Sequence, residues 1–264
     1  MDIAPGRKAL ITGGASGFGR EVARRLGEAG ARIALLDIDL ERAAATAAGL
    51  PGEGHLGVGA DVRSLEQTAT AVGGAAEALG GIDTVVISAG VFTMGPIEQI
   101  SEADWDRTIE INLKGAFTTL RAAAAPLRAS GRGRVVTIAS DAGRRGFPTQ
   151  SAYVSSKFGL VGFTESIAAE LAPDGVHVNG VCPVYCPTTT MGGEVVEAKV
   201  ERDSKDADAV IASAAATNPL GRNATEGDVA DAVLFLISEQ ASFLTGVLLD
   251  VDGGARLGSV PGLD

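Results

Sequence analysis

Short apolar runs alternate with longer amphipathic stretches along this chain. The first apolar run, at 8–11, predicts a buried strand, and apolar residues at helical spacing predict a helix from about Gly17 to Gly30. The same reasoning predicts further strands at 32–36, 56–60, 83–87, 134–139, 176–181 and 247–251, and further helices near 64–79, 101–129, 151–172 and 226–238. Strands and helices therefore alternate through most of the sequence.

The predicted strands are apolar throughout rather than at every second position. This is expected when helices cover both faces of a parallel sheet. Strand–helix–strand repeats with right-handed crossovers build a doubly wound sheet. The sequence therefore predicts a Rossmann-type α/β fold with three layers (α/β/α), as a single domain over residues 1–264.

The segment 184–217 interrupts this alternation. It is rich in Thr, Glu, Asp, Lys and Ala and has only scattered apolar residues. A long polar insertion in a compact domain is more often a lid than a linker. We therefore expect 184–217 to be a mobile lid over substrate.

Composition and charge narrow the class of protein. The 264 residues include 22 Lys and Arg against 33 Asp and Glu, which gives a net charge of −11. A field of that sign disfavours nucleic acid and anionic membranes as partners. No secretion signal or membrane-spanning apolar run is visible, and two cysteines are too few for a disulfide framework. We expect a soluble protein of a reducing cytoplasm.

A glycine-rich turn, T-G-G-A-S-G-F-G at 12–19, follows the first predicted strand. Glycine lets the backbone approach a pyrophosphate without a Cβ clash, and the next helix presents free N–H groups to phosphates. Such a turn alone is a weak signal, since it also occurs as plain structure. Its place between a strand and a helix favours a dinucleotide site.

Asp37 ends the second predicted strand, where an acid accepts hydrogen bonds from the adenosine ribose and repels a 2′-phosphate. A competing interpretation is that Asp37 caps the helix that begins near Leu40, but Asp39 fits that role better. Neither Ser16 nor Ile38 is basic, so neither offers a partner to a 2′-phosphate. The sequence therefore favours NAD over NADP.

Tyr153 and Lys157 are four residues apart on the predicted helix 151–172, so they share a face. The N-terminal end of this helix lies near the carboxyl edge of the sheet, where ligands bind in doubly wound folds. A neighbouring ammonium and the helix dipole both favour a phenolate, which would make Tyr153 a base. An isolated pair with this spacing is more often a surface contact.

Two further polar residues strengthen the catalytic interpretation. Ser140 follows the strand 134–139 at the same carboxyl edge and is placed to bind a substrate oxygen. Asn112 is a polar residue inside an apolar helical segment. The alternative for Asn112 is a buried amide satisfied by backbone groups.

Taken in order, these motifs resemble the short-chain dehydrogenase/reductase family over nearly the whole chain. The matching positions are T-G-x-x-x-G-x-G at 12–19, Asp61-Val62, Ala89-Gly90, Asn112, Ser140, Tyr153-x-x-x-Lys157, Asn179, Pro183 and Thr188. Each match is weak alone, and the ordered set is strong.

The resemblance implies a role for each catalytic residue. Tyr153 would be the general acid/base. Lys157 would hold the nicotinamide ribose and keep Tyr153 acidic. Ser140 would orient the substrate oxygen, and Asn112 would support a water relay to Lys157. Gln150 and Tyr185 would also contact substrate, by family position only.

The resemblance likewise implies a set of cofactor residues. Asp61 and Val62 would bracket the adenine, and Thr188 would contact the nicotinamide carboxamide. The full set is Gly13, Ser16, Gly17, Phe18, Gly19, Asp37, Asp61, Val62, Ala89, Gly90, Tyr153, Lys157, Pro183 and Thr188.

The chain departs from the family pattern at two positions. Ser88 stands where an Asn usually precedes Ala-Gly, so a hydrogen bond that fixes this turn is in doubt. Val184 stands where a Gly usually follows Pro183, which would push the backbone or narrow the site.

Other chemistry-bearing residues are interpreted as structural. Cys182 and Cys186 lack a nearby His or Cys to complete a zinc set, so no metal is expected. His55 and His177 begin strands, at the edge opposite the expected site. Arg144 and Arg145 would suit an anionic substrate, although solvated surface arginines are commoner.

The sequence thus predicts an NAD-dependent dehydrogenase of a secondary alcohol or its ketone, with a polyol, cyclic alcohol or hydroxylated metabolite as substrate. One alternative is an NADPH-dependent biosynthetic ketoreductase, against which Asp37 argues. The other is a catalytically silent dinucleotide-binding regulator, which should lack Ser140, Tyr153 or Lys157. Ala-rich stretches on helices 101–129 and 151–172, together with the family's habit of pairing these helices, predict a homotetramer.

Overall fold

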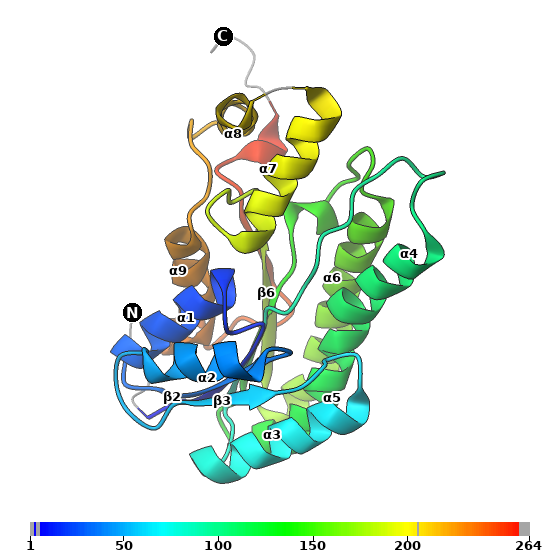
Figure 1. Cartoon of the computed structure of the whole chain (residues 1–264). Coiled ribbons are helices and arrows are strands. Elements are labelled where there is room, and N and C mark those ends of the chain that lie inside the picture. Colours follow the sequence, from blue (N-terminus) through cyan, green and yellow to red (C-terminus); the bar gives the residue numbers. More distant parts are fainter. Residues whose placement is uncertain (1–2, 4–5, 205, 259–264) are drawn as a thin grey trace.

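The computed structural model describes residue 3 and residues 6–204 and 206–258. In this part of the chain, seven strands form one parallel sheet in the order β3-β2-β1-β4-β5-β6-β7 (Figure 1). The strands are β1 (Lys8–Thr12), β2 (Arg32–Asp37), β3 (Leu56–Gly59), β4 (Thr84–Ile87), β5 (Arg134–Ile138), β6 (His177–Pro183) and β7 (Leu248–Val251). The strand order reverses between β1 and β4, and ligands of doubly wound sheets bind at such a switch point. The prediction of a Rossmann-type sheet is confirmed.

Helices cover both faces of the sheet. They are α1 (Gly17–Glu28), α2 (Leu40–Ala48), α3 (Leu65–Leu79), α4 (Glu102–Ile109), α5 (Gly115–Ala129), α6 (Ser151–Leu171), α7 (Thr190–Asp203), α8 (Ala207–Ala216) and α9 (Glu226–Ile237). One layer contains α3, α5 and α6, and the opposite layer contains α1, α2 and α9 (Figure 1). Every predicted element shared with the structure has both ends within two residues of the expected position.

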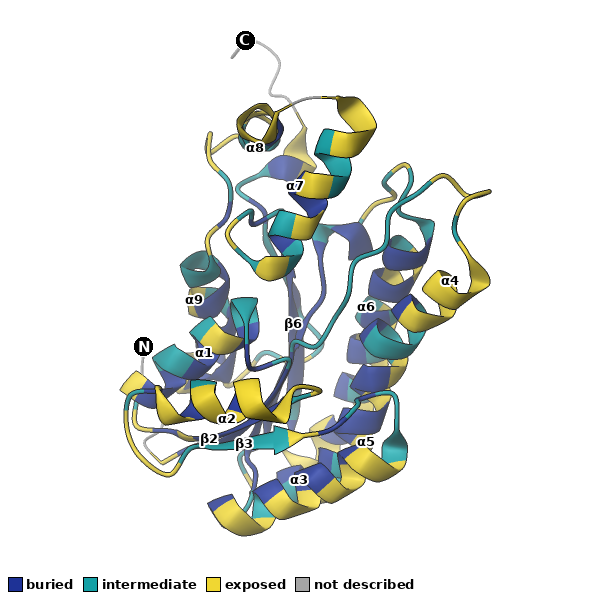
Figure 2. Cartoon of the chain, in the orientation of Figure 1, coloured by how far each residue is buried: buried dark blue, intermediate teal, exposed yellow. Residues whose placement is uncertain are grey.

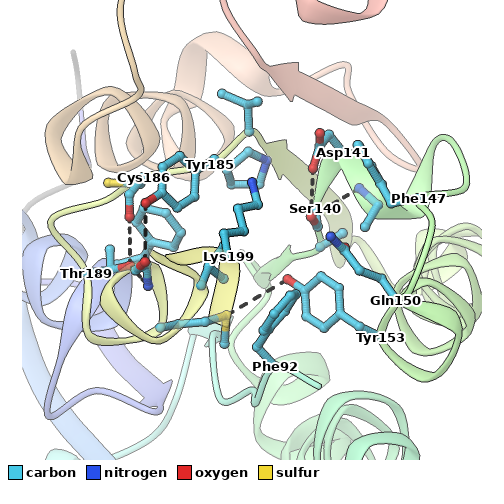
Figure 3. A pocket seen from close by; sticks show the side chains of 18 residues that line it. Phe92, Ser140, Asp141, Phe147, Gln150, Tyr153, Tyr185, Cys186, Thr189 and Lys199 are labelled. Atoms are coloured by element: carbon cyan, nitrogen blue, oxygen red, sulfur yellow. Dashed lines mark hydrogen bonds between the residues drawn. The ribbon is translucent and has the colours of Figure 1, made fainter. Parts of the chain in front are cut away.

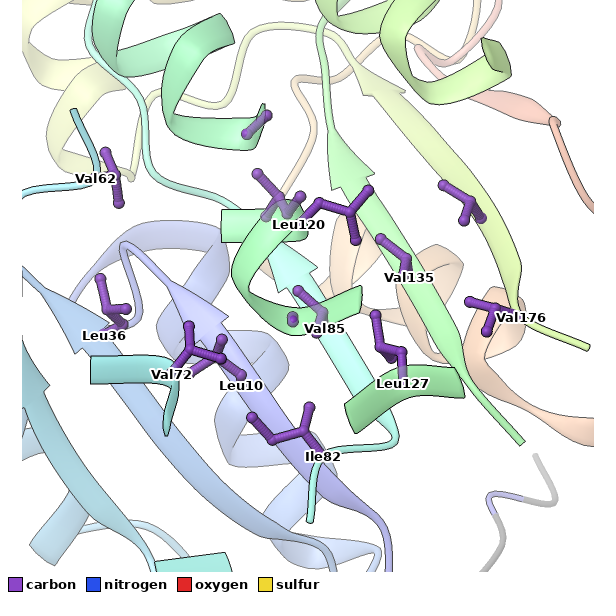
Figure 4. Packing of buried hydrophobic residues seen from close by; sticks show 14 of the residues in the cluster. Leu10, Leu36, Val62, Val72, Ile82, Val85, Leu120, Leu127, Val135 and Val176 are labelled. Carbon is purple, nitrogen blue, oxygen red and sulfur yellow. The ribbon is translucent and has the colours of Figure 1, made fainter. Parts of the chain in front are cut away.

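Successive residues of each central strand pack into opposite layers. On β1, Leu10 joins the cluster beneath α3 and α5 (Figure 4), whereas Ala9 and Ile11 join the cluster beneath α1 and α9. The strands are buried while the outer faces of the helices are exposed (Figure 2). Burial on both faces explains why the strands are apolar at every position.

The predicted helix 101–129 is helical throughout but not uniform. A π-turn at Glu110–Lys114 separates α4 from α5. The turn contains Asn112, whose amide bonds to backbone groups outside the helix. An inserted polar group of this kind interrupts the regular ladder of helical hydrogen bonds, and apolar periodicity does not reveal it.

The interrupting segment 184–217 folds as α7 and α8, joined to the domain near the carboxyl edge of the sheet (Figure 1). Cys186, Val195, Val196 and Val210 are its buried apolar side chains, and most of its charged residues are exposed. Across the described residues, no helix combines the length and the apolar character that crossing a bilayer requires.

Candidate active site

A long groove crosses the carboxyl edge of the sheet at the switch point. From the glycine turn, Gly13, Ser16, Gly17 and Phe18 line it, and from the following strand ends, Asp37, Asp61, Val62, Ala89 and Gly90. The groove encloses about 1370 Å³ of empty space, including part of its open mouth. These nine residues belong to the predicted cofactor set.

The glycine turn leaves no room for side chains. Gly13 has a φ of +62°, and a Cβ there would lie 2.8 Å from the Cα of Ala89. A Cβ on Gly19, which is buried behind the groove, would lie 2.6 Å from the carbonyl oxygen of Gly13. Ser16 is the N-cap residue of α1, but its side chain makes no capping hydrogen bond. The first backbone N–H groups of α1 are therefore left without that partner and are available to a ligand in the groove. Such a cradle fits a pyrophosphate.

Asp37 and Asp39 have separate roles. Asp39 caps α2 by accepting a hydrogen bond from Arg42 N at 3.0 Å, as predicted. The Asp37 carboxylate accepts from Ala15 N (3.3 Å) and Asp39 N (3.2 Å) and lines the groove. Asp37 is therefore available to a ribose.

The groove wall also carries three arginines that the motif pattern does not reveal, namely Arg42, Arg63 and Arg107. Arg42 lines it beside Asp37, and Arg63 forms a two-pronged ion pair with Asp61, with an Nη2–Oδ2 distance of 2.6 Å. This pair holds the pKa of Asp61 below its usual range. Ser16 and Ile38 offer no positive charge to a 2′-phosphate, but the groove arginines do.

A second cavity adjoins the groove and contains the reactive side chains (Figure 3). All four predicted substrate residues line it: Ser140, Gln150, Tyr153 and Tyr185. Phe18, Thr189 and Met191 line both the groove and this substrate cavity. A ligand in the groove and a ligand in the cavity would therefore be in contact.

Ser140 and Tyr153 are held by different partners. The Ser140 hydroxyl accepts a hydrogen bond from Ala142 N and donates one to Asp141 Oδ1, both at 3.1 Å. The Tyr153 hydroxyl points to Met191 Sδ at 4.0 Å (Figure 3). Its ring packs edge-on against Phe92, with centroids 5.0 Å apart. The phenol is therefore fixed in direction by packing rather than by a strong hydrogen bond.

Lys157 lies beneath the tyrosine. Its Nζ donates to Ile138 O at 3.0 Å and lies 5.6 Å from the centre of the Tyr153 ring. Burial lowers the pKa of Lys157 to about 8. Burial also raises the pKa of Tyr153 to about 12, against a smaller lowering by Ser140. Desolvation is thus the largest effect on this phenol in the unliganded protein, and the expectation that Lys157 keeps Tyr153 acidic stays a prediction.

Asn112 uses its whole amide in structural bonds. It accepts from Val91 N (2.8 Å) and donates to Val91 O (2.9 Å) and Ser156 Oγ (3.0 Å). The alternative interpretation of Asn112 as a satisfied buried amide therefore describes its contacts. A Cβ on Gly90 would lie 3.3 Å from Asn112 Oδ1 and 3.8 Å from Lys157 Nζ, so both residues lie behind this part of the groove.

Besides Gly19, Tyr153 and Lys157, two more predicted cofactor residues lie outside the groove wall. Pro183 lines the substrate cavity. Thr188 is exposed, and its hydroxyl donates to Glu226 Oε2 at 2.6 Å. The neighbouring Thr189 lines both spaces and caps α7 by accepting from Gly192 N.

The two departures from the family pattern have clear consequences. Thr12 Oγ1 accepts hydrogen bonds from Ser88 N (3.1 Å) and Ala89 N (3.2 Å), so this hydroxyl fixes the turn after β4. Val184 bonds through its N–H to Val251 O at 3.1 Å and lines the substrate cavity. Its side chain therefore narrows the cavity where a glycine would leave space.

The residues interpreted as structural have structural partners. Arg144 pairs with Asp250 at 2.9 Å, away from any substrate role. His55 Nε2 lies 2.9 Å from Pro51 O, and His177 Nδ1 lies 3.0 Å from Leu244 O. Cys182 is a buried free thiol, like Cys186. The described residues include no group of three or more His, Cys, Asp or Glu arranged to hold a metal ion.

Several residues of the substrate cavity carry no motif. They are Phe92, Phe147 and Lys199. Phe92 closely follows the predicted Ala89-Gly90, whereas Phe147 lies in a loop and Lys199 in the 184–217 segment. Proximity to a cofactor motif is the one sequence signal for such a residue, and it applies to Phe92. Met191 also lines the cavity, as expected from its place in the predicted lid.

Comparisons with known proteins agree with this geometry. Residues 13–256 match the family profile described as Enoyl-(Acyl carrier protein) reductase. The chain is 36% identical over 246 residues to 2-(S)-hydroxypropyl-CoM dehydrogenase 3 of Xanthobacter autotrophicus, covering 92% of this chain and 94% of that protein. It is 37% identical over 251 residues to D-threitol dehydrogenase of Mycolicibacterium smegmatis, covering 94% and 92%.

A solved structure is also similar. Sorbitol-6-phosphate 2-dehydrogenase from Erwinia amylovora superposes with a TM-score of 0.90 at 28% identity, covering 94% of this chain and 98% of that one. Fold, site and relatives agree, and the chain belongs to the short-chain dehydrogenase/reductase family.

Proposed function

We propose that the protein transfers a hydride between NAD and a secondary alcohol or its ketone, with a polyol, cyclic alcohol or hydroxylated metabolite as substrate. Its relatives establish the broader class, an alcohol/ketone oxidoreductase that uses a nicotinamide dinucleotide. The observation that carries the proposal is the cavity in which Ser140 and Tyr153 adjoin the groove.

In this scheme the substrate hydroxyl binds between Ser140 Oγ and the Tyr153 hydroxyl. Ser140 exchanges its bond to Asp141 for one to the substrate oxygen. Tyr153 takes the hydroxyl proton in oxidation and returns it in reduction. Charged Lys157 favours the phenolate as the proton moves, and Asn112 supports the segment behind Lys157. A bound nicotinamide supplies the hydride chemistry that no side chain provides.

The groove residues would hold the dinucleotide. The cradle of Gly13, Gly17 and Gly19 and the start of α1 suit the pyrophosphate. Asp61 and Val62 would bracket the adenine. A contact between Thr188 and the carboxamide requires its hydroxyl to leave Glu226, whereas Thr189 already lines the groove.

The choice between NAD and NADP depends on two groove residues with opposite effects, Asp37 and Arg42. The Asp37 carboxylate suits ribose hydroxyls and repels a 2′-phosphate. Arg42 is the observation that favours the NADPH-dependent ketoreductase alternative. The regulator alternative is disfavoured because Ser140, Tyr153 and Lys157 are all present.

The test is NADH formation with a panel of secondary alcohols at alkaline pH, run beside NADP. We expect turnover that is faster with NAD. A clear preference for NADP would favour the ketoreductase alternative, and dinucleotide binding without turnover of any alcohol or ketone would favour the regulator.

We also propose that α7 and α8 form a mobile lid. The large apolar side chains buried in α7 and α8 are those of Val195, Val196 and Val210, so little apolar area anchors the two helices. Closure would exclude water from the hydride path. Hydrogen exchange of 190–212 should be fast in the free protein and slow with NADH and a substrate analogue. Equal protection in both states would indicate that α7 and α8 are rigid whether or not ligands are bound.

The protein is further proposed to be a cytoplasmic homotetramer. Phe117 on α5 and Phe158 on α6 are 43% and 46% exposed, on the helices that carry the Ala-rich stretches. Exposed aromatic side chains on neighbouring helices suit a protein interface. The two free thiols suit a reducing compartment. Light scattering that shows a monomer at micromolar concentration would contradict the oligomer.

A further inference from the structure

The substrate cavity continues outward into a second space beneath α7 and α8. Phe147, Val184, Tyr185 and Lys199 line both spaces. Among the described residues, Tyr153 lines the inner space but not the outer one. A substrate whose reacting carbon lies at Tyr153 therefore has room to extend toward Lys199.

Lys199 carries a charge in this cavity, and the two carboxylates that act on it, Asp141 and Asp203, are each in contact with an arginine. Within the part of the chain that the structure describes, its ammonium forms no ion pair and no hydrogen bond. It lies over the Tyr185 ring, 5.2 Å from the centroid, and projects across the cavity (Figure 3). Burial lowers its pKa, with a further lowering by Arg202 and smaller opposite effects of Asp141 and Asp203. A partly desolvated and unpaired cation is unfavourable, and an anionic ligand would relieve this cost.

The arginines around the same space are already paired. Arg202 contacts Asp203 with an Nε–Oδ1 distance of 2.6 Å. Arg145 lies 3.7 Å from Asp141 and stacks on Phe147 at 4.8 Å. Lys199 differs from both because no described carboxylate lies in ion-pair contact with it, and its ammonium lies over an aromatic ring.

The carboxylates nearby do not reverse this balance. Three cationic side chains and two carboxylates line the outer space, although the whole chain has a net charge of −11. Asp141 accepts a hydrogen bond from Ser140 and lies beside Arg145, and Asp203 pairs with Arg202, so each carboxylate already has a cationic neighbour. The local field around Lys199 therefore favours an anion.

We propose that Lys199 binds an acidic group on the substrate, and that the substrate is a hydroxy compound or ketone carrying a carboxylate, sulfonate or phosphate. This inference rests on the proposed function and narrows its substrate class. A lysine ammonium is a compact charge with three donors, so it binds any of these groups. Lys199 on α7 would recognise the acidic group, whereas Tyr153 on α6 would transfer the proton.

The test uses pairs of secondary alcohols that differ in one acidic group. The pairs are 4-hydroxycyclohexanecarboxylate and its methyl ester, 2-hydroxypropane-1-sulfonate and the matching methyl sulfone, and sorbitol 6-phosphate and sorbitol. Each is assayed with NAD and with NADP. Wild-type protein should prefer the acid in at least one pair, and that pair identifies the acidic group.

Lys199→Gln should raise KM for the preferred acid by about 10- to 100-fold, the range for a hydrogen bond to a charged group, and leave kcat and the neutral partner little changed. Lys199→Arg should retain part of the preference. Lys8→Gln removes the same charge at the opposite edge of the sheet, where Lys8 bonds to Gly80 O, and should leave the preference intact. NADH binding and circular dichroism report whether each variant is folded.

The outcomes separate the two proposals. Neutral partners turned over as well as the acids, or a preference for acid that survives Lys199→Gln, would overturn the role of Lys199 while the dehydrogenase proposal stands. Failure of every alcohol with both dinucleotides, in protein that binds NADH, would contradict the proposed function and this inference with it.

Discussion

The dinucleotide groove and the substrate cavity adjoin one another but are built differently. The groove is built around the backbone of a glycine turn, with the start of α1 and the ends of neighbouring strands beside it, mostly between residues 12 and 91. The cavity is lined by side chains from separate segments, such as Phe92, Phe147, Tyr185 and Lys199.

This difference separates what the two regions determine. Backbone shape suits a ligand that is the same in every member of a family. Side chains from loops can change without disturbing the sheet, so they determine which substrate fits. Variants in the groove should therefore change dinucleotide affinity, and variants in the cavity should change the chemistry or the choice of alcohol.

The largest expected effect is in the cavity. Tyr153→Phe should lower kcat by about 10²- to 10⁴-fold, because the phenolic oxygen exchanges the proton. NADH affinity, measured by fluorescence, should be nearly unchanged. A loss of less than about tenfold where chemistry limits the rate would remove Tyr153 from the mechanism.

Lys157 should make stability depend on pH. Burial lowers its pKa from 10.5 to about 8, so between these values the unfolded chain holds a proton that the folded protein has released. The free energy of unfolding should therefore rise with pH across this window, by up to about 3 kcal/mol. Lys157→Met should abolish this rise in urea titrations. Tyr153, with its pKa raised from 10.0 to about 12, should lower stability above pH 10 in both proteins.

In the groove, Asp37→Ala should narrow the gap between NAD and NADP. Loss of hydrogen bonds to a carboxylate should lower kcat/KM for NAD by about 10- to 100-fold, while NADP gains from the loss of repulsion. Turnover of a fixed alcohol with saturating NAD should change little. An unchanged ratio of the two cofactors would show that Asp37 does not face the ribose.

Gly13→Ala tests whether backbone shape makes the groove. Its φ of +62° and the 2.8 Å approach to Ala89 predict weaker NADH binding and a stability loss of at least about 1–2 kcal/mol. Gly30→Ala is the matched control, because its φ is +81° but a Cβ there meets no atom within 4 Å. Equal NADH affinity in the two variants would mean that the close approach at Gly13 is unimportant.

The same contrast explains what could be predicted from sequence. Strand and helix positions follow from burial on two sheet faces, and the groove follows from short motifs at strand ends, as with Gly13 and Asp37. Each of these signals is local in the chain.

The remainder depends on contacts between distant segments. The bond between Thr12 and the turn at Ser88 joins two strand ends, and the π-turn at Asn112 depends on Val91. Arg42 faces the groove only because α2 packs beside β2. Lys199 is one charge in a polar helix, and only the fold brings it into the substrate cavity without a partner.

The central claim, hydride transfer from a secondary carbinol carbon to NAD, is tested most directly with deuterium. The best alcohol of the panel is prepared with deuterium on its carbinol carbon, and the products are analysed by mass spectrometry and NMR. We predict that the deuterium appears at C4 of the reduced nicotinamide on one face only, and that turnover slows where chemistry limits the rate. Deuterium that is lost to water or kept in the oxidised product would contradict the account.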